Sequence, residues 1–233
     1  MSKDTLEGKI DSMFKAGVHF GYSKTRRHPS TSQYIFGTKN KNDIIDLEKS
    51  AALLATAETF MSELGKGMKT VLFVGVKPES KRAVIDTAMA LDMPYVSERW
   101  IGGIITNFGE IKKRIATLEE LREKREKGEL DMYTKKERLL IDLKIEKLTK
   151  YFGGLTGLKK APDALFIIDT KREHIAMTEA RKSGIPVISI SNTDSNIKGI
   201  DFPVVANDAS VSSITYLMNE VKEAYRNGKV TTA

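Results

Sequence analysis

The sequence predicts an α/β protein whose parallel sheet is covered by helices on both faces, with a helical arm inserted in the middle of the chain. Short, continuous apolar runs such as 70–75 and 164–168 are typical of buried parallel strands. Helical patterns of ten or more residues separate most of these runs, which favours parallel strands joined by crossover helices. The expected strands of this sheet are 70–75, 94–96, 164–168, 186–190 and an edge strand at 203–205.

The N-terminal part is predicted to form a helix and two short extended segments. Apolar residues of 7–16 share one helical face, and Gly17 is expected to end that helix. Residues 34–37 and 44–45 are expected to be extended, with a turn at 40–42 between them.

The remaining helices of the main domain follow from apolar residues at helical spacing. They are 47–64, ended by Gly65; 79–91; 173–182, ended by Gly184; and 209–226, ended by Asn227 and Gly228.

The arm is expected at 107–152, which leaves 1–106 and 153–233 as the α/β domain. Each half has one narrow apolar seam, which predicts an antiparallel coiled-coil hairpin. The seam residues are Phe108, Ile111, Ile115 and Leu118, then Ile141, Ile145, Leu148 and Phe152. Gly128 is expected at the turn, and Thr134 is the expected N-cap of the returning helix. The ion pairs expected between residues four positions apart are Glu110 with Arg114, Glu120 with Lys124, and Glu123 with Lys127.

Composition limits the classes of function. The 38 Lys and Arg exceed the 31 Asp and Glu, giving a net charge of +7, which favours a polyanionic partner such as nucleic acid. The absence of cysteine excludes disulfides and thiolate metal sites. No apolar run has membrane-spanning length, and the charged N-terminus does not resemble a signal peptide, so a soluble cytoplasmic protein is expected.

No complete catalytic or cofactor motif is present. The glycines around the first buried strand match neither G-x-G-x-x-G nor the phosphate loop, and the three histidines lack metal-binding spacing. His174 lies just past a strand end, where catalytic groups often occur, but Asp169 or Thr170 as a helix cap explains that segment better. The polar loop 191–196 is the best remaining phosphate or cation candidate, although turn chemistry also explains it.

Two basic segments are candidate RNA contacts. Residues 18–29 combine aromatic residues with Lys24, Arg26 and Arg27 and contain no acid, which suits base stacking and phosphate contact. A solvated basic loop would have the same composition. The arm has thirteen basic and ten acidic residues between 110 and 150, and such a balanced run is most often a solvated face.

Several motifs, taken in order, resemble bacterial-type ribosomal protein S-two of the small subunit. They occur at 13–21, 25–27, 34–37, 40–41, 44–49, 71–75, 99–103 with 106–107, 130–137, 162–169, 173–176 and 184–187. The likeness extends over nearly the whole chain. Departures occur at Tyr22, where the family commonly has histidine, and in segments 23–24, 28–31 and 191–194.

This resemblance implies a flavodoxin-like domain with an inserted coiled-coil hairpin, and a structural rather than enzymatic role without a cofactor. It implies binding of 16S ribosomal RNA between the head and body of the small subunit and support for the attachment of ribosomal protein S-one. The RNA-facing candidates carried over are Thr25, Arg26, Arg27, Lys41, Arg99 and Trp100. For Trp100 a core anchor is the favoured alternative. Charge alone adds Lys112, Lys113 and Arg114.

Two other functions are compatible with the sequence. One is an enzyme that binds a nucleotide or sugar phosphate at loop 191–196. The other is an adaptor whose coiled-coil hairpin binds only protein.

Overall fold

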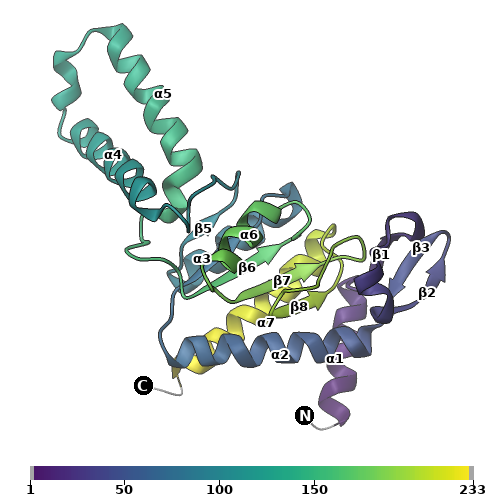
Figure 1. The fold of residues 1–233 in the computed structure, drawn as a ribbon. Coiled ribbons are helices and arrows are strands. Elements are labelled where there is room, and N and C mark those ends of the chain that lie inside the picture. Colours follow the sequence, from purple (N-terminus) through teal and green to yellow (C-terminus); the bar gives the residue numbers. More distant parts are fainter. Residues whose placement is uncertain (1–2, 231–233) are drawn as a thin grey trace.

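The computed structural model describes residues 3–230, and its centre is a five-stranded parallel sheet (Figure 1). The strands are β4 (Val71–Val74), β5 (Tyr95–Val96), β6 (Ala164–Ile168), β7 (Val187–Ser191) and β8 (Phe202–Val205). Their spatial order is β5-β4-β6-β7-β8, and all four pairings are parallel. This is the strand order of flavodoxin-like sheets, so the predicted fold class is confirmed.

Two hydrophobic clusters cover the two faces of the sheet. Phe73 and Phe166 point to the face that packs against α2 (Leu47–Lys66), α3 (Pro78–Leu91) and α7 (Val211–Val230). Leu72 and Leu165, one residue earlier on the same strands, point to the other face. That face is covered by α6 (His174–Lys182) and the segment 97–107 that leads into the arm.

Two glycines expected to end helices instead lie inside them. Helix α2 continues past Gly65 to Lys66, and α7 continues past Gly228 to Val230. A Cβ on Gly65 would lie 2.2 Å from the Tyr225 carbonyl oxygen, and one on Gly228 would lie 2.0 Å from that of Ser62. The prediction was wrong because both glycines permit the close approach of these two helices.

The N-terminal residues form a small layer beside the carboxyl edge of the main sheet. Helix α1 (Lys3–Lys15) is followed by a turn in which Gly17 has a φ of +74°. Strand β1 (Phe20–Ser23) and the 3-10 turns η1 (Lys24–Arg26) and η2 (Pro29–Tyr34) come next. Strands β2 (Ile35–Lys39) and β3 (Asn42–Ile45) complete an antiparallel sheet of order β1-β3-β2. The connecting Asn40 and Lys41 both have positive φ, which is typical of a tight hairpin turn.

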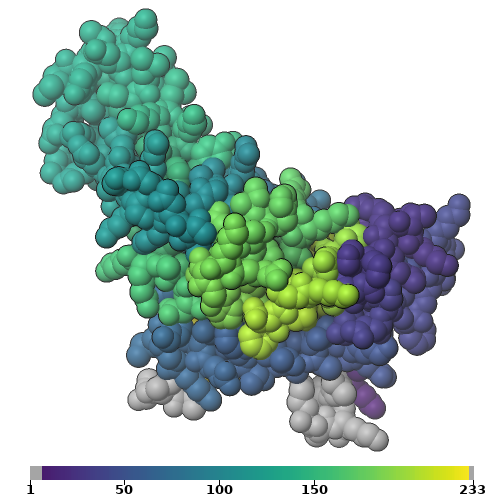
Figure 2. Space-filling model, in the orientation of Figure 1, coloured from purple at the N-terminus to yellow at the C-terminus, as the bar shows by residue number. Residues whose placement is uncertain are grey.

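The arm consists of α4 (Phe108–Glu126) and α5 (Lys135–Phe152), which project together from the domain (Figures 1 and 2). The turn η3 (Glu129–Met132) joins them, and η4 (Gly153–Leu155) returns the chain to the sheet. Gly128 has a φ of +73°, and Thr134 forms a capping box with Glu137. The predicted turn and N-cap are therefore confirmed, while the coiled-coil character of the pair stays a prediction.

The exposed ion pairs of α4 match two of three predictions. Lys124 lies 2.6 Å from Glu120, and Lys127 lies 2.6 Å from Glu123. Glu110 binds Lys113 at 2.6 Å rather than Arg114, because residues three and four apart are both neighbours on a helix. Over residues 3–230, no helix combines the length and apolarity needed to cross a membrane.

Candidate nucleic-acid interface

The start of η1 and the β2–β3 turn form one exposed basic corner. The Lys24 amide donates to the Lys41 carbonyl oxygen at 2.9 Å, which joins two segments separated in sequence. Thr25, Arg26 and Lys41 are all exposed there. The structure thus brings together three of the residues predicted to contact RNA.

Arg26 is held in place while much of its side chain stays accessible. Its guanidinium lies 4.4 Å from the centre of the Tyr22 ring and 3.1 Å from a carboxylate oxygen of Asp194. Its side chain is nevertheless 54% exposed. Lys171 reaches the same Asp194 oxygen at 2.9 Å, so two cations share one buried carboxylate. A local excess of positive charge remains at this surface.

Arg27, the next residue, is bound within the protein. Its guanidinium donates two hydrogen bonds to the fully buried carboxylate of Asp43, at 2.8 and 2.5 Å, and a third to Thr38 at 3.2 Å. The hydrogen bonds from Arg27 hold the pKa of Asp43 below its ordinary value. Arg27 therefore ties η1 to β3, and less of its side chain is available to RNA than of Arg26.

The polar loop 191–196, the sequence's best phosphate candidate, is covered by the N-terminal layer. The Thr193 carbonyl oxygen accepts hydrogen bonds from the His28 amide and the Thr31 hydroxyl, both at 2.8 Å. The Tyr22 amide donates to the Thr193 hydroxyl at 3.0 Å. Because residues 191–195 are buried and Thr193 is bonded to the protein's own groups, a nucleotide or sugar phosphate would have to displace these contacts to bind there.

The crevice between β4 and β6, where the strand order reverses, is also filled. Lys77 follows β4, and its ammonium lies 2.6 Å from Asp169 and 2.7 Å from Asp208. Asn192 donates to the other oxygen of Asp208 at 3.1 Å. Burial opposes the charge on Lys77, but the two carboxylates raise its pKa above the ordinary value. Ligands of such sheets bind at this reversal point, and here a buried ion cluster occupies it. Across residues 3–230, no group of three or more His, Cys, Asp or Glu could hold a metal ion.

A second polar network fixes the segment that leads into the arm. Glu179 of α6 accepts hydrogen bonds from the Trp100 indole at 3.1 Å and from the Gly103 amide at 2.7 Å. Its second oxygen accepts from the Ile105 and Thr106 amides and the Thr106 hydroxyl, each at 3.2 Å. Burial opposes ionisation of Glu179, but these donors together lower its pKa.

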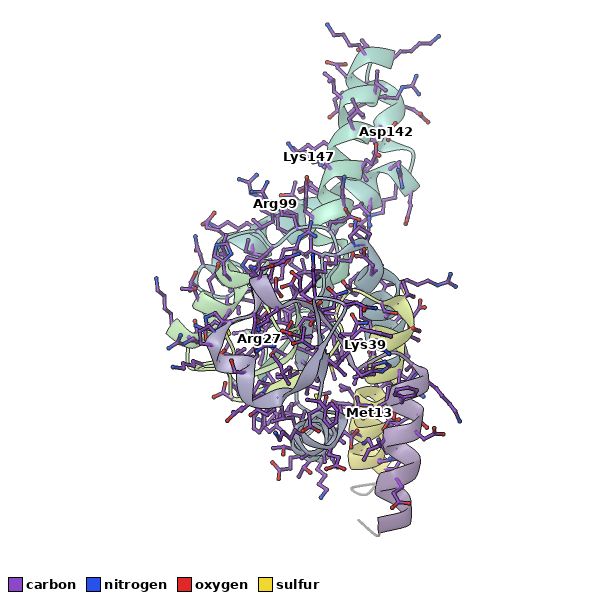
Figure 3. All side chains as sticks on the ribbon, turned by 90° about the vertical axis from the view of Figure 1, so that its right-hand side faces the viewer. Met13, Arg27, Lys39, Arg99, Asp142 and Lys147 are labelled. Atoms are coloured by element: carbon purple, nitrogen blue, oxygen red, sulfur yellow. The ribbon has the colours of Figure 1, made fainter. Side chains whose placement is uncertain are left out.

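Trp100 is therefore a core anchor beneath the arm and not an exposed base-stacking residue. It is 5% exposed, and its indole N–H is bound to Glu179. The preceding Arg99 is exposed and lies where the domain meets the arm, apart from Arg27 in the N-terminal layer (Figure 3).

The three candidates on α4 are all exposed but differ in their neighbours. Lys113 is bound to Glu110, whereas no carboxylate of the described residues lies within 4.0 Å of Lys112 or Arg114. The predicted residues thus form two groups, one on the N-terminal layer and one at the base of the arm.

Sequence reasoning missed the acidic partners that position these groups. Asp43, Asp194 and Glu179 each bind residues distant in the chain, so local patterns do not identify their partners. Glu179 gives one usable signal, because it shares the buried face of α6 with Ala176 and Ala180. A carboxylate on an apolar helix face needs donors from elsewhere.

Comparison with known proteins identifies the family. The family model for ribosomal protein S2 matches residues 13–228. The chain belongs to this family. It is a family of ribosomal structural proteins rather than enzymes.

Individual relatives agree with this assignment. The chain is 42% identical over 220 residues to a protein of Sulfurimonas denitrificans named small ribosomal subunit protein uS2. This match covers 94% of this chain and 85% of the relative. Proteins with the same name from Nitratiruptor sp. and Pseudoalteromonas translucida are 41% and 40% identical. Each match covers 94% of this chain, and 82% and 91% of those relatives.

Proposed function

We propose that this chain is a structural constituent of the small ribosomal subunit in the cytoplasm, and that it binds 16S ribosomal RNA between the head and the body. The observation that carries the proposal is the family match over residues 13–228, together with relatives of about 40% identity named uS2. The net charge of +7 supports a polyanionic partner.

The N-terminal basic corner is the first proposed RNA contact. Thr25, Arg26 and Lys41 are exposed, and Arg26 is pre-positioned by Tyr22 and Asp194. A side chain already held in one conformation loses less entropy when it binds a phosphate. Arg27 supports this corner from within through Asp43.

The base of the arm is the second proposed contact, through Arg99, Lys112, Lys113 and Arg114. We propose that residues 107–152 act as an arm on the α/β domain formed by 1–106 and 153–233, so that one chain reaches two regions of RNA. The network around Glu179 favours this arrangement because it fixes the chain just before the arm begins.

Sedimentation of the tagged protein from cell lysate tests the proposal. We expect co-migration with small subunits in a sucrose gradient, lost after ribonuclease treatment or in high salt. Free migration at the top of an untreated gradient would contradict the ribosomal function. A protein-only adaptor would instead keep its partners after ribonuclease treatment.

Variants test the N-terminal contact separately. Arg26→Gln with Lys41→Gln should weaken 16S RNA binding and flatten its salt dependence, because each lost phosphate contact removes a released counterion. Glu48→Gln with Lys66→Gln, exposed positions on α2, serves as the control. An unchanged salt slope in the first variant would exclude this corner as a contact.

We further propose that the chain supports attachment of ribosomal protein S-one through an exposed aromatic surface on the N-terminal layer. The side chains of Phe14, Phe20 and Phe36 are 58%, 52% and 81% exposed. The His19 ring stacks on Phe14, with ring centres 4.5 Å apart, and lies tilted against Phe20, with ring centres 4.1 Å apart. Large exposed aromatic groups of this kind favour a protein partner.

A pull-down of purified S-one by this chain tests that surface. Phe36→Ser should reduce capture about tenfold or more. Leu139→Ser, which alters a similarly exposed apolar side chain on the arm, should leave capture unchanged. Equal capture by both variants would exclude the aromatic surface as the attachment site.

A further inference from the structure

Two grooves that differ in net charge lie on either side of the base of the arm. One groove, of about 870 Å³, is lined by three carboxylates and three cations. These are Glu98, Asp142 and Glu146, with Arg122, Arg125 and Lys150. Its charges balance, and Arg125 lies 3.9 Å from Asp142.

The other groove, of about 650 Å³, carries excess positive charge. Arg114 of α4 lines it together with Lys144 and Lys147 of α5, and its only carboxylate is Glu110. Glu110 is already bound to Lys113 at 2.6 Å, while no carboxylate of residues 3–230 lies within 4.0 Å of the three lining cations. Figure 3 shows Lys147 and Asp142 as labelled side chains on the arm, with Arg99 at its junction with the domain.

Apolar and aromatic groups form the rest of the cationic groove. Ile101, Leu148 and Tyr151 line it at the end nearest the domain. Cations beside a tyrosine ring suit a ribose-phosphate chain whose base or sugar can pack on the ring. An acidic peptide would satisfy the charges but would make less use of a planar aromatic surface.

We propose that this groove, through Arg114, Lys144 and Lys147, binds the phosphate backbone of ribosomal RNA, with Tyr151 contacting an adjacent nucleotide. The proposal rests on the proposed function and adds two lysines and a tyrosine from α5 to the contact surface. It also assigns the opposite, charge-balanced groove no phosphate contact.

A charge-matched pair of triple variants tests the proposal. The groove variant combines Arg114→Gln, Lys144→Gln and Lys147→Gln. The control combines Arg138→Gln, Lys124→Gln and Lys127→Gln, which removes one arginine and two lysines that are already paired with carboxylates. Both variants lose the same net charge from the arm, and circular dichroism checks that both are folded.

The measurement is binding of the full chain to transcribed 16S RNA at salt concentrations from about 0.05 to 0.3 M. Three lost phosphate contacts should reduce the salt slope by about two to three and the affinity near 0.15 M by about ten- to one-hundredfold. The control should keep the wild-type slope within about one unit. Equal losses in both variants would overturn the proposal, because general charge would then explain the effect.

Directed cleavage gives an independent readout. The chain has no cysteine, so a single introduced cysteine carries an iron–EDTA group without background labelling. A probe on Glu110→Cys, in the cationic groove, should cleave bound RNA strongly, and one on Glu146→Cys, in the other groove, should cleave it weakly. The reverse pattern would overturn the proposal.

The outcomes separate this inference from the proposed function. Wild-type protein that fails to bind 16S RNA at any salt concentration contradicts the proposed function, and with it this site. Wild-type binding that the groove variant retains contradicts the groove alone. Retained RNA binding with loss of a ribosomal protein partner would show that the groove binds an acidic protein segment instead.

Discussion

Glu179→Gln should loosen the attachment of the arm while leaving the side chain nearly unchanged in shape. The two carboxylate oxygens accept five hydrogen bonds, from Trp100, Gly103, Ile105 and Thr106. A glutamine has one oxygen and one NH₂ group, so either two or three of these donors would face another donor. The substitution also removes the negative charge that strengthens the remaining bonds.

The expected cost follows from the number of bonds lost. Hydrogen bonds to charged groups contribute about 1.5–3 kcal/mol each, and buried donors left without a partner cost about 1–3 kcal/mol. Partial relaxation of the 101–106 segment toward water reduces the total, so we expect a loss of about 3 kcal/mol. For a chain of this length, that corresponds to a melting temperature lower by about 6–12 °C.

Trp100 provides a local assay because it is the only tryptophan in the chain. Its buried indole should emit at short wavelength in the wild type and shift to longer wavelength in Glu179→Gln. Thr106→Val removes one hydroxyl donor, so it should cost about 1 kcal/mol. Glu119→Gln, on the exposed face of α4, is the control. An unchanged urea midpoint and unchanged emission in Glu179→Gln would refute the role of this carboxylate.

Three further substitutions test the buried groups of the domain. Lys77→Met leaves Asp169 and Asp208 without their cation and should cost about 3–5 kcal/mol in urea unfolding, partly restored by adding Asp208→Asn. Burial raises the pKa of Glu173 to about 7, so the folded state retains a proton that the unfolded state releases above pH of about 4.3. Stability should therefore fall between about pH 4.5 and 7. Glu173→Gln should remove this slope and gain about 3 kcal/mol at pH 8, whereas parallel pH profiles would contradict it. Gly65→Ala should cost about 3 kcal/mol because its Cβ meets the facing helix, whereas a gain in stability would support a simple helix-end role.

Local patterns were sufficient to predict the five strands of the main sheet and the long helices, but not β1 or the 3-10 turns that follow it. The continuous apolar runs at 71–74 and 164–168 form central strands, and the helical spacing in 107–152 predicted the two helices of the arm. The same patterns failed at Gly65 and Gly228. A glycine inside a helix and one that ends a helix look alike until the facing surface is known.

The candidate site was less predictable because its geometry depends on long-range pairs. Arg26 and Arg27 are adjacent in sequence and belong to the same motif. Arg27 is bound to Asp43, whereas Arg26 stays half-exposed over the Tyr22 ring. A count of charges does not distinguish the two arginines. The positions of the buried carboxylates of Asp43 and Asp194 decide that Arg27 is structural and that Arg26 is accessible.

The arm shows how a balanced charge count can conceal an asymmetric surface. Its apolar seam fixes the rotation of α5, so residues on either side of the seam face different grooves. Lys144 and Lys147, three residues apart, lie on one flank, while Asp142 and Glu146, four residues apart, lie on the other. The thirteen basic and ten acidic residues therefore do not form a uniformly solvated face. For a helical arm with a seam, the net charge of each flank, counted separately, is the quantity that indicates which side can meet a phosphate backbone.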